Sequence, residues 1–499
     1  MVVPVEDPEL RVKSAAGRWV LLATVLGSGL TMLDATVVSI ALPTIGRDLH
    51  TSFSSLQWVV NGYTLTLAGF LLLGGALGDR YGRRRVFLIG VAWFATASLL
   101  CAIAPNAGIL IAARALQGVG AALLAPGSLA ILQASFARED RAAAIGAWSG
   151  LGGVMAAVGP FVGGWLVQSA SWRWIFLINI PFALTVLVVA SRHIPETRDE
   201  HAPPGLDVTG AVLTAAGLGG VIYALTEGAE RGWTSSAVAG AGLAGIACLV
   251  AFGLVEARSR HPLVPLVMFK VRQFSAANLV TFSVYGALGG ALFLLPIQLQ
   301  TVVGFSPLAS GTALLPLTLI MLTGSARAGR LATRIGPRIP MTIGPIISGG
   351  GLALMAQIGS SSSYMSGVLP GVVVFAVGLA LTVAPLTATV LGAVEDEHAG
   401  VASAVNSDVA RAAGLVAIAV LPVIAGIRNA DFGNAVRFSG GFHTAMLIAG
   451  GLLVAGGLLA YATIRRPLVA PPEPEPEAAH AFHCALDAPP QLVDASADA

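Results

Sequence analysis

The sequence predicts an all-α integral membrane protein in which two six-helix bundles are joined by an inserted two-helix hairpin, giving 14 transmembrane helices. Three observations predict this fold. The chain is apolar with little charge, it has fourteen apolar runs long enough to cross a bilayer, and one basic, glycine-containing loop occurs twice. A loop that returns between apolar helices indicates that one bundle was duplicated.

Composition places the chain in a membrane. Of its 499 residues, 55% are hydrophobic and 11% are charged, and the mean hydropathy is +0.80. A soluble protein of this size could not cover its surface with so few charges. The net charge of +2 is too small to indicate a nucleic-acid partner. The spacing of Cys101, Cys248 and Cys484 indicates neither a metal site nor a disulfide framework.

Each apolar run can cross a hydrocarbon core of about 30 Å as a helix, because a helix satisfies its own backbone hydrogen bonds there. The expected spans are 19–41, 55–76, 86–104, 107–131, 142–168, 174–191, 207–226, 236–255, 274–295, 308–326, 340–358, 366–391, 400–424 and 442–463.

The distribution of lysine and arginine predicts the orientation, since basic residues concentrate in cytoplasmic loops. With the N-terminus inside, the opposite loops hold few basic residues, and only Arg114 and Arg411 fall inside spans. We therefore expect the chain to lie in the inner (cytoplasmic) membrane, with both termini in the cytoplasm. The basic residues of the external loops are Arg47, Arg173, Arg231, Arg428 and Arg437.

The repeated loop fixes which helices correspond. Gly75–Arg85 returns in altered form as Gly329–Ile339, and spans nine to fourteen follow the order of spans one to six. Spans seven and eight lie outside the repeat. The expected organisation is a cytoplasmic N-terminus (1–18), a first bundle (19–192), a linker (193–206), the hairpin (207–256), a linker with an interfacial helix around Leu266–Lys270 (257–273), a second bundle (274–466) and a disordered tail (467–499).

The Gly75–Arg85 loop resembles the signature loop of the major facilitator superfamily, and other stretches resemble its fourteen-span drug:proton antiporters. Thr333 replaces the acid in the second copy of the loop, and Asp408 stands where that family pattern has an uncharged residue. The resembling stretches are Leu33–Pro43, Leu56–Val59, Arg114–Gly120, Gly159–Gly164 and Ser171–Pro181.

Ionisable residues inside spans are the first functional candidates. Asp34 lies about 22 Å along span one, and Arg114 lies at a similar depth on span four. The resemblance implies that both helices line a central cavity and that opening of this pair decides whether Asp34 binds a proton; a static neutralising pair is the alternative. Asp408 and Arg411 share one face of span thirteen, where they either neutralise each other or provide a second proton or cation site.

Two further motifs are expected to govern conformational change. The first loop could act as a latch, with its arginines facing the acidic segment Glu395–His398 and Asp79 facing the start of span thirteen; otherwise the arginines only set topology. Gly-Pro with Gly-Gly in span five resembles the antiporter motif of the family. The latch residues are Gly75, Asp79, Arg80, Gly82, Arg83 and Arg84, and those of the helix motif are Gly159, Pro160, Gly163 and Gly164.

Together these features predict a proton-coupled exporter of small amphipathic, possibly cationic drugs or toxic compounds that works by alternating access, without a cofactor or metal. No phosphate loop, nucleophile elbow or zinc motif is present, so we expect a non-enzyme whose partners are a small-molecule substrate, protons and lipids, acting as a monomer. A dedicated exporter of one endogenous metabolite, antibiotic or lipid is an alternative, as is a non-transporting scaffold or receptor. Expected cavity residues are Trp58, Asn61, Tyr63, Gln117, Tyr285 and Gln298.

Overall fold

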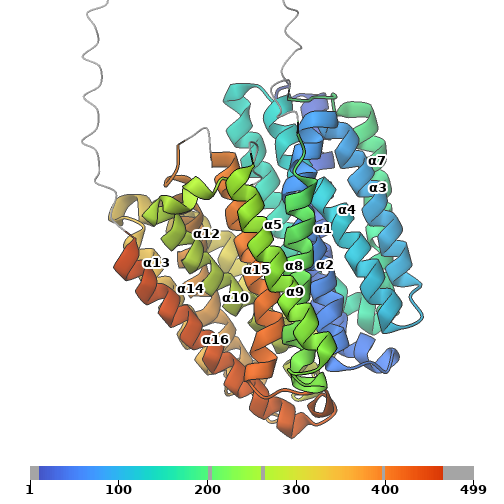
Figure 1. Ribbon diagram of the computed structural model, residues 1–499, viewed down its shortest axis with the longest axis vertical. Helices are drawn as coiled ribbons and strands as arrows, with labels where there is room; N and C mark the ends of the chain where they lie inside the picture. Colours follow the sequence, from blue (N-terminus) through green and yellow to red (C-terminus); the bar gives the residue numbers. More distant parts are fainter. Residues whose placement is uncertain (1–9, 200–204, 260–263, 396–398, 465–499) are drawn as a thin grey trace, which may run out of the picture. The chain divides into compact units, whose positions relative to one another are not determined.

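The computed structural model describes residues 10–199, 205–259, 264–395 and 399–464, and nearly all of their regular structure is helical. Two groups of helices are joined by the pair α8 and α9 (Figure 1). The first group is α1 (Ala15–Asp48), α2 (Phe53–Tyr81), α3 (Arg83–Ala102), α4 (Ala107–Ser135), α5 (Arg138–Ser169), α6 (Trp174–Leu177) and α7 (Asn179–His193).

The helices that follow are α8 (Val208–Arg231), α9 (Ser236–Arg258), α10 (Arg272–Thr301), α11 (Pro307–Ala313), α12 (Leu315–Ile335), α13 (Arg338–Met355), α14 (Leu369–Leu391), α15 (Ala399–Ile424) and α16 (Ala435–Thr463). Shorter helical turns lie at Leu266–Lys270, Tyr364–Val368 and Asn429–Asp431.

A helix occupies each of the fourteen predicted spans within the described residues. Thirteen are long and apolar enough to cross a membrane. Span six is divided between α6 and α7, and span ten between α11 and α12. The remaining span is α13, an 18-residue helix that contains Arg338 and two prolines and packs against α14 and α16. The fold prediction is therefore confirmed.

Several helices run beyond the apolar stretches that predicted them, because polar residues cap their first turns. The side chains of Ser14, Ser52 and Asn106 accept hydrogen bonds from backbone N–H groups at the starts of α1, α2 and α4. Such caps satisfy donors that have no partner within the helix. The apolar pattern alone therefore marks the membrane core of each helix and not its ends.

The two copies of the repeated loop share a backbone conformation. Gly82 and Gly336 end their helices with φ values of +112° and +85°, a region that favours glycine. The matching arginines also behave alike. Arg84 donates to the carbonyl of Ile194, just after the last helix of the first group, and Arg338 donates to that of Tyr461, near the end of α16. Each loop is thus tied to the final helix of its own half.

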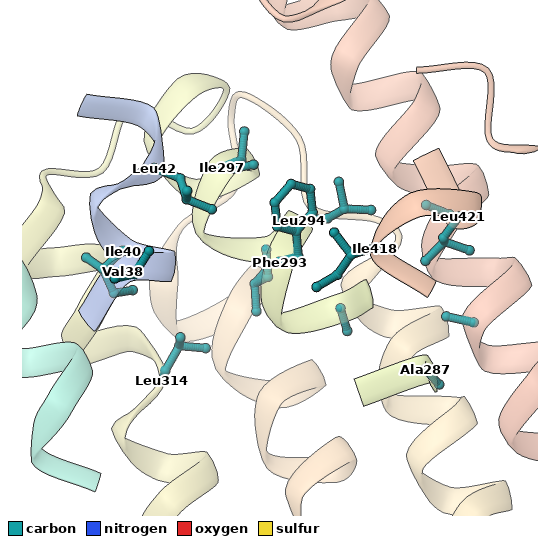
Figure 2. Close-up of a cluster of buried hydrophobic side chains, with 14 of the residues drawn as sticks. Val38, Ile40, Leu42, Ala287, Phe293, Leu294, Ile297, Leu314, Ile418 and Leu421 are labelled. Carbon is teal, nitrogen blue, oxygen red and sulfur yellow. The ribbon is translucent and has the colours of Figure 1, made fainter. Parts of the chain in front are cut away.

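We name the two ends of the helices by residues. The His50 end carries the α1–α2 connection, and the Gly82 end carries the α2–α3 connection. At the His50 end an apolar cluster joins both groups, with Val38, Ile40 and Leu42 of α1 facing Phe293, Leu294 and Ile297 of α10 and Ile418 and Leu421 of α15 (Figure 2).

Four hydrogen bonds cross between the two groups in the described part of the chain, and all lie in the parts of their helices nearer the His50 end. They run from Ser54 N to Asn429 Oδ1 (2.9 Å), from Gln57 Nε2 to Ile418 O (2.5 Å), from Gln300 Nε2 to Ile40 O (2.9 Å) and from Leu308 N to Gln168 Oε1 (3.3 Å). These bonds and the apolar cluster close the two bundles together at this end.

Helix α8 of the hairpin packs against both bundles, on α2 and on α15. The Trp58 ring of α2 lies 6.2 Å from that of Tyr223, while Ile222 joins Leu415 and Ala419 of α15 in a small apolar cluster. At the His50 end, Asn429 N donates to Glu230 Oε1 at 2.7 Å. The expected interfacial helix is a short 3-10 turn, Leu266–Lys270, with an exposed Leu266 and a buried Met268.

Candidate functional site

Asp34 and Arg114 form an ion pair in the interior of the first bundle. Asp34 of α1 is fully buried, and Arg114 of α4 is 1% exposed. Arg114 Nη1 donates to Asp34 Oδ2 at 2.5 Å, as the similar depths of the two residues led us to expect. Taking two charges out of water is costly unless they are paired and hydrogen-bonded, so each charge in this site depends on the other.

Three neutral side chains complete the hydrogen bonding around Asp34. Gln117 Nε2 donates to Asp34 Oδ1 (2.8 Å) and Asn179 Nδ2 donates to the same oxygen (3.2 Å). Both amides also donate to Ser98 Oγ, and Gln117 Oε1 accepts from Arg114 Nη1 at 2.7 Å. Helices α1, α3, α4 and α7 therefore meet at one carboxylate.

Sequence reasoning missed two members of this network. Ser98 and Asn179 were not predicted, although Asn179 lies within the Ser171–Pro181 stretch that resembles the family. Gln117 was expected in the cavity, but its amide is fully buried beside Asp34. Its position three residues after Arg114 was the available signal, because residues three apart share a helical face.

Aromatic rings and a backbone carbonyl surround the Arg114 guanidinium. Arg114 Cζ lies 4.2 Å from the ring centroid of Tyr63 and 5.9 Å from that of Phe176, and Nε donates to the carbonyl of Val59 at 3.1 Å. A desolvated guanidinium over an aromatic face is held by cation–π attraction. Arg114 thus has favourable contacts beyond its carboxylate, including Tyr63, which was expected in the cavity.

Asp408 and Arg411 form a looser pair on α15. Arg411 Nη1 lies 3.9 Å from Asp408 Oδ1, and the two side chains are 29% and 22% exposed respectively. Asp408 Oδ1 is buried without a hydrogen bond in the described residues. This pair lies outside the Asp34 network.

The repeated loop contacts the chain segment that follows α7. Glu196 accepts hydrogen bonds from the backbone N–H groups of Arg84 and Arg85 (3.0 and 3.2 Å), so its carboxylate caps the start of α3. Arg83 Nε donates to Asp79 Oδ1 at 2.9 Å, and Arg83 N donates to the carbonyl of Thr197. A carboxylate at a helix N-terminus is favourable because the N–H groups there carry partial positive charge.

The expected latch partner is only partly within the described residues. Glu395 is exposed, whereas 396–398 lie outside the described part of the chain. The Arg80 guanidinium lies 5.5 Å over the ring of Tyr81. A β-carbon at Gly75 would meet Pro126 at ordinary contact distance, 3.7 Å, so of the two glycines in the predicted latch only Gly82 is required by its backbone.

The glycines of α5 divide between two partners. A β-carbon at Gly159 would collide with Thr36 of α1, one at Gly163 would lie only 3.0 Å from Val37 of α1, and one at Gly164 would lie 2.5 Å from the carbonyl oxygen of Pro307 in α11. Conversely, a β-carbon at Gly311 would collide with the carbonyl of Pro160. The motif therefore brings α5 close to α1 on one face and to the second bundle on another.

The remaining expected cavity residues have separate environments. Trp58 lies against the hairpin. Asn61 is fully buried, and neither polar atom of its side chain has a hydrogen bond among the described residues. Gln298 donates to Ile358 O and Ser439 Oγ within the second bundle, and Tyr285 of α10 is partly buried.

Metal binding has no evident site, because no three His, Cys, Asp or Glu side chains among the described residues gather closely enough to hold an ion.

Comparisons with known proteins agree with this architecture. The sequence profile of the Major Facilitator Superfamily matches residues 24–419. The chain is 36% identical over 480 residues to the puromycin resistance protein pur8 of Streptomyces alboniger, covering 93% of this chain and 94% of that protein. It is 35% identical over 411 residues to the tetracenomycin C resistance and export protein of Streptomyces glaucescens, covering 82% and 76%.

Solved structures show the same fold at low sequence identity. A POT family transporter in complex with a thioalcohol-conjugated peptide has a TM-score of 0.68 and 13% identity, covering 91% of this chain and 98% of its own. A bacterial homolog of the human lysosomal transporter Spinster has a TM-score of 0.65 and 16% identity, covering 90% and 97%. Because the family profile matches residues 24–419, most of the sequence, the chain belongs to the Major Facilitator Superfamily.

Proposed function

We propose that this protein exports small amphipathic compounds from the cytoplasm in exchange for protons, by alternating access between its two bundles. The observation that carries the proposal is the buried Asp34–Arg114 pair, which places a carboxylate and a guanidinium inside a membrane bundle. The names of the relatives, which include resistance to puromycin and export of tetracenomycin C, support a drug-like substrate.

The charge distribution supports an orientation with the Gly82 end in the cytoplasm. Lysine and arginine are concentrated in the segments at that end, as expected for cytoplasmic loops. The His50 end is then external. Because the four hydrogen bonds between the bundles lie towards this end, we interpret the structure as closed to the outside.

In this conformation three donors surround the Asp34 carboxylate. Its two oxygens accept hydrogen bonds from Arg114, Gln117 and Asn179, and donors to a carboxylate stabilise the charge. A proton carried inward on Asp34 would thus be released when this network forms, leaving the protein ready to take substrate from the cytoplasmic side. Opening towards the outside would have to loosen the network for Asp34 to bind a new proton.

A dedicated exporter of one compound is the second candidate, because several relatives are named for a single antibiotic. Tetracenomycin C, puromycin and methylenomycin A each name a relative, whereas another is named a multidrug resistance protein. A panel of chemically diverse compounds separates the two candidates, since a dedicated exporter would transport one scaffold only. A scaffold or receptor without transport would leave all compounds untransported.

Everted membrane vesicles test the proposal directly. With an imposed gradient, acidic inside, addition of a transported compound should dissipate the gradient in the wild type and fail to do so in Asp34→Asn. Glu139→Gln is the matched control, because Glu139 is an acid on α5 with a side chain 70% exposed in a surface ion pair. Drug-driven proton release at the wild-type rate in Asp34→Asn would refute the assignment of coupling to Asp34.

A further inference from the structure

The repeat relates a covered face of α2 to an exposed face of α12. Helix α8 lies against α2 and α15 (Figure 1), and a β-carbon at Gly69 of α2 would lie 2.7 Å from that of Ala215 in α8. By the register of the repeated loop, Leu65 and Gly69 correspond to Leu319 and Thr323 of α12. Thr323 is exposed, and Leu319 is 57% exposed. The hairpin thus covers this face in the first half, and its counterpart in the second half is open.

The open face of α12 carries arginines where α2 carries apolar residues. Arg327 and Arg330 correspond to Leu73 and Ala76, and both arginines are exposed. Being three residues apart on a helix, they are neighbours on one surface. The only hydrogen bond of the Arg327 guanidinium runs from Nη1 to the carbonyl of Thr323 on its own helix, at 2.6 Å. Neither arginine forms an ion pair with any residue in the ranges that the structure describes.

A groove of about 260 Å³ runs between α12 and α14, and Arg327 is its one charged lining residue. Leu331 of α12 and Val377 of α14 are each 40% exposed, so the groove opens at the surface of the bundle. The lining residues include Ile320, Gly324, Arg327, Leu331, Val377 and Leu381. The site therefore combines a guanidinium with an apolar groove along two membrane helices.

Arg327 lies within the membrane-spanning part of the chain. At 1.5 Å per residue it is about 12 Å from Ile335, the last residue of α12. The next residue is Gly336, the counterpart of Gly82, so the groove belongs to the half of the membrane at the Gly82 end. A charged side chain at such a depth is costly unless it is paired or reaches the polar headgroups. A lipid phosphate at this level supplies the counter-charge that Arg327 needs.

We propose that α12 and α14 bind a phospholipid of net negative charge from the cytoplasmic leaflet. Its phosphate contacts Arg327 and Arg330, and one acyl chain lies in the groove towards Ile320. Arginine suits this role because its planar fork of N–H donors matches the oxygens of a phosphate. Basic pockets between transmembrane helices on the cytoplasmic side are known to hold anionic headgroups. The choice of leaflet rests on the orientation given under the proposed function, whereas binding itself does not depend on transport.

Native mass spectrometry of the purified full chain, released from detergent micelles, counts bound lipids and protein copies in one measurement. The probes are phosphatidylglycerol, phosphatidylcholine with the same acyl chains, and inorganic phosphate. We expect one phosphatidylglycerol to bind more tightly than phosphatidylcholine, and inorganic phosphate not to displace it. Arg327→Gln should weaken the binding of phosphatidylglycerol by about tenfold, the effect of losing one charge-assisted hydrogen bond.

Two further variants separate this site from general attraction between a basic protein surface and an anionic lipid. Arg192→Gln is the matched control, because it removes the same charge from an exposed position in the last turn of α7, in the first bundle. It should bind phosphatidylglycerol as the wild type does. Val377→Trp fills the groove without changing a charge, and it should weaken binding because the acyl chain loses its place.

Equal affinity for the two lipids, unchanged binding in Arg327→Gln or Val377→Trp, or the same loss in Arg192→Gln would overturn the inference. Displacement of the lipid by inorganic phosphate would overturn it too, since the arginines would then bind a soluble anion. A dimer in place of the lipid-bound monomer would assign this face to a second copy of the chain. Failure of the proposed function is seen separately: proton exchange by Asp34→Asn in vesicles would refute the coupling and leave lipid binding unchanged.

Discussion

Replacing either Asp34 or Arg114 alone should leave one buried charge without its partner. Each single variant should therefore destabilise the protein more, for each charge removed, than a double variant that removes both charges together. Arg114→Met leaves a buried carboxylate with only the amides of Gln117 and Asn179 as donors. Asp34→Asn leaves a buried guanidinium, and the introduced amide must point its NH₂ group at Arg114 or at the two other amides, all of which are donors.

The expected loss of unfolding free energy can be worked out from the burial and pairing of the two charges. Unit charges about 4 Å apart attract by about 4 kcal/mol at an effective dielectric constant of about 20. Removing one partner of a buried pair typically costs about 3–5 kcal/mol, because the remaining charge is uncompensated. We expect each single variant to lose about 3 kcal/mol or more of unfolding free energy. The double variant should lose about 2–3 kcal/mol less than the sum.

Reversible unfolding of the full chain in mixed detergent micelles measures these differences. Single variants that each lose less than about 1 kcal/mol, or a double variant equal to the sum, would refute the reasoning.

Three further predictions concern contacts elsewhere in the structure. Gly164→Val should abolish transport in the vesicle assay without unfolding the protein, because any β-carbon at this position would meet Pro307 of the second bundle. Gly146→Val on the same helix should transport normally, because a β-carbon there meets open space. Glu196→Ala should destabilise the start of α3 by about 1 kcal/mol, because the variant loses the carboxylate that caps this helix. Backbone amides in the first turn of α3 should then exchange hydrogen faster, and unchanged exchange would contradict the cap. Glu230→Ala should speed exchange after α15, where its carboxylate accepts a backbone hydrogen bond.

The sequence predicted those features that follow from local pattern. Apolar length located the helices, and counting residues along two helices placed Asp34 and Arg114 at similar depth, where the structure pairs them. Both copies of the repeated loop also place a glycine at the same position in the sequence, and Gly82 and Gly336 both adopt positive φ values. These features need no knowledge of how the helices pack.

Features that depend on helix packing were not predictable in the same way. Ser98 and Asn179 are ordinary polar residues until α3 and α7 bring them to Asp34. The composition of α8 does not indicate that this helix packs between the two bundles. The expected cavity residues stay a prediction. At 100° per residue, Trp58 and Tyr63 of that set point about 140° apart on α2.

A continuous set of contacts leads from Asp34 to the closed end of the two bundles. Thr36 and Val37, one turn along α1 from Asp34, lie in the grooves left by Gly159 and Gly163 of α5. The next glycine on α5, Gly164, abuts α11 of the second bundle. A change in the position of α1 when Asp34 gains a proton would therefore act on α5, and through it on the contact that holds the bundles together. Close packing makes this transmission effective, because backbones in direct contact have no flexible side chains to absorb the movement.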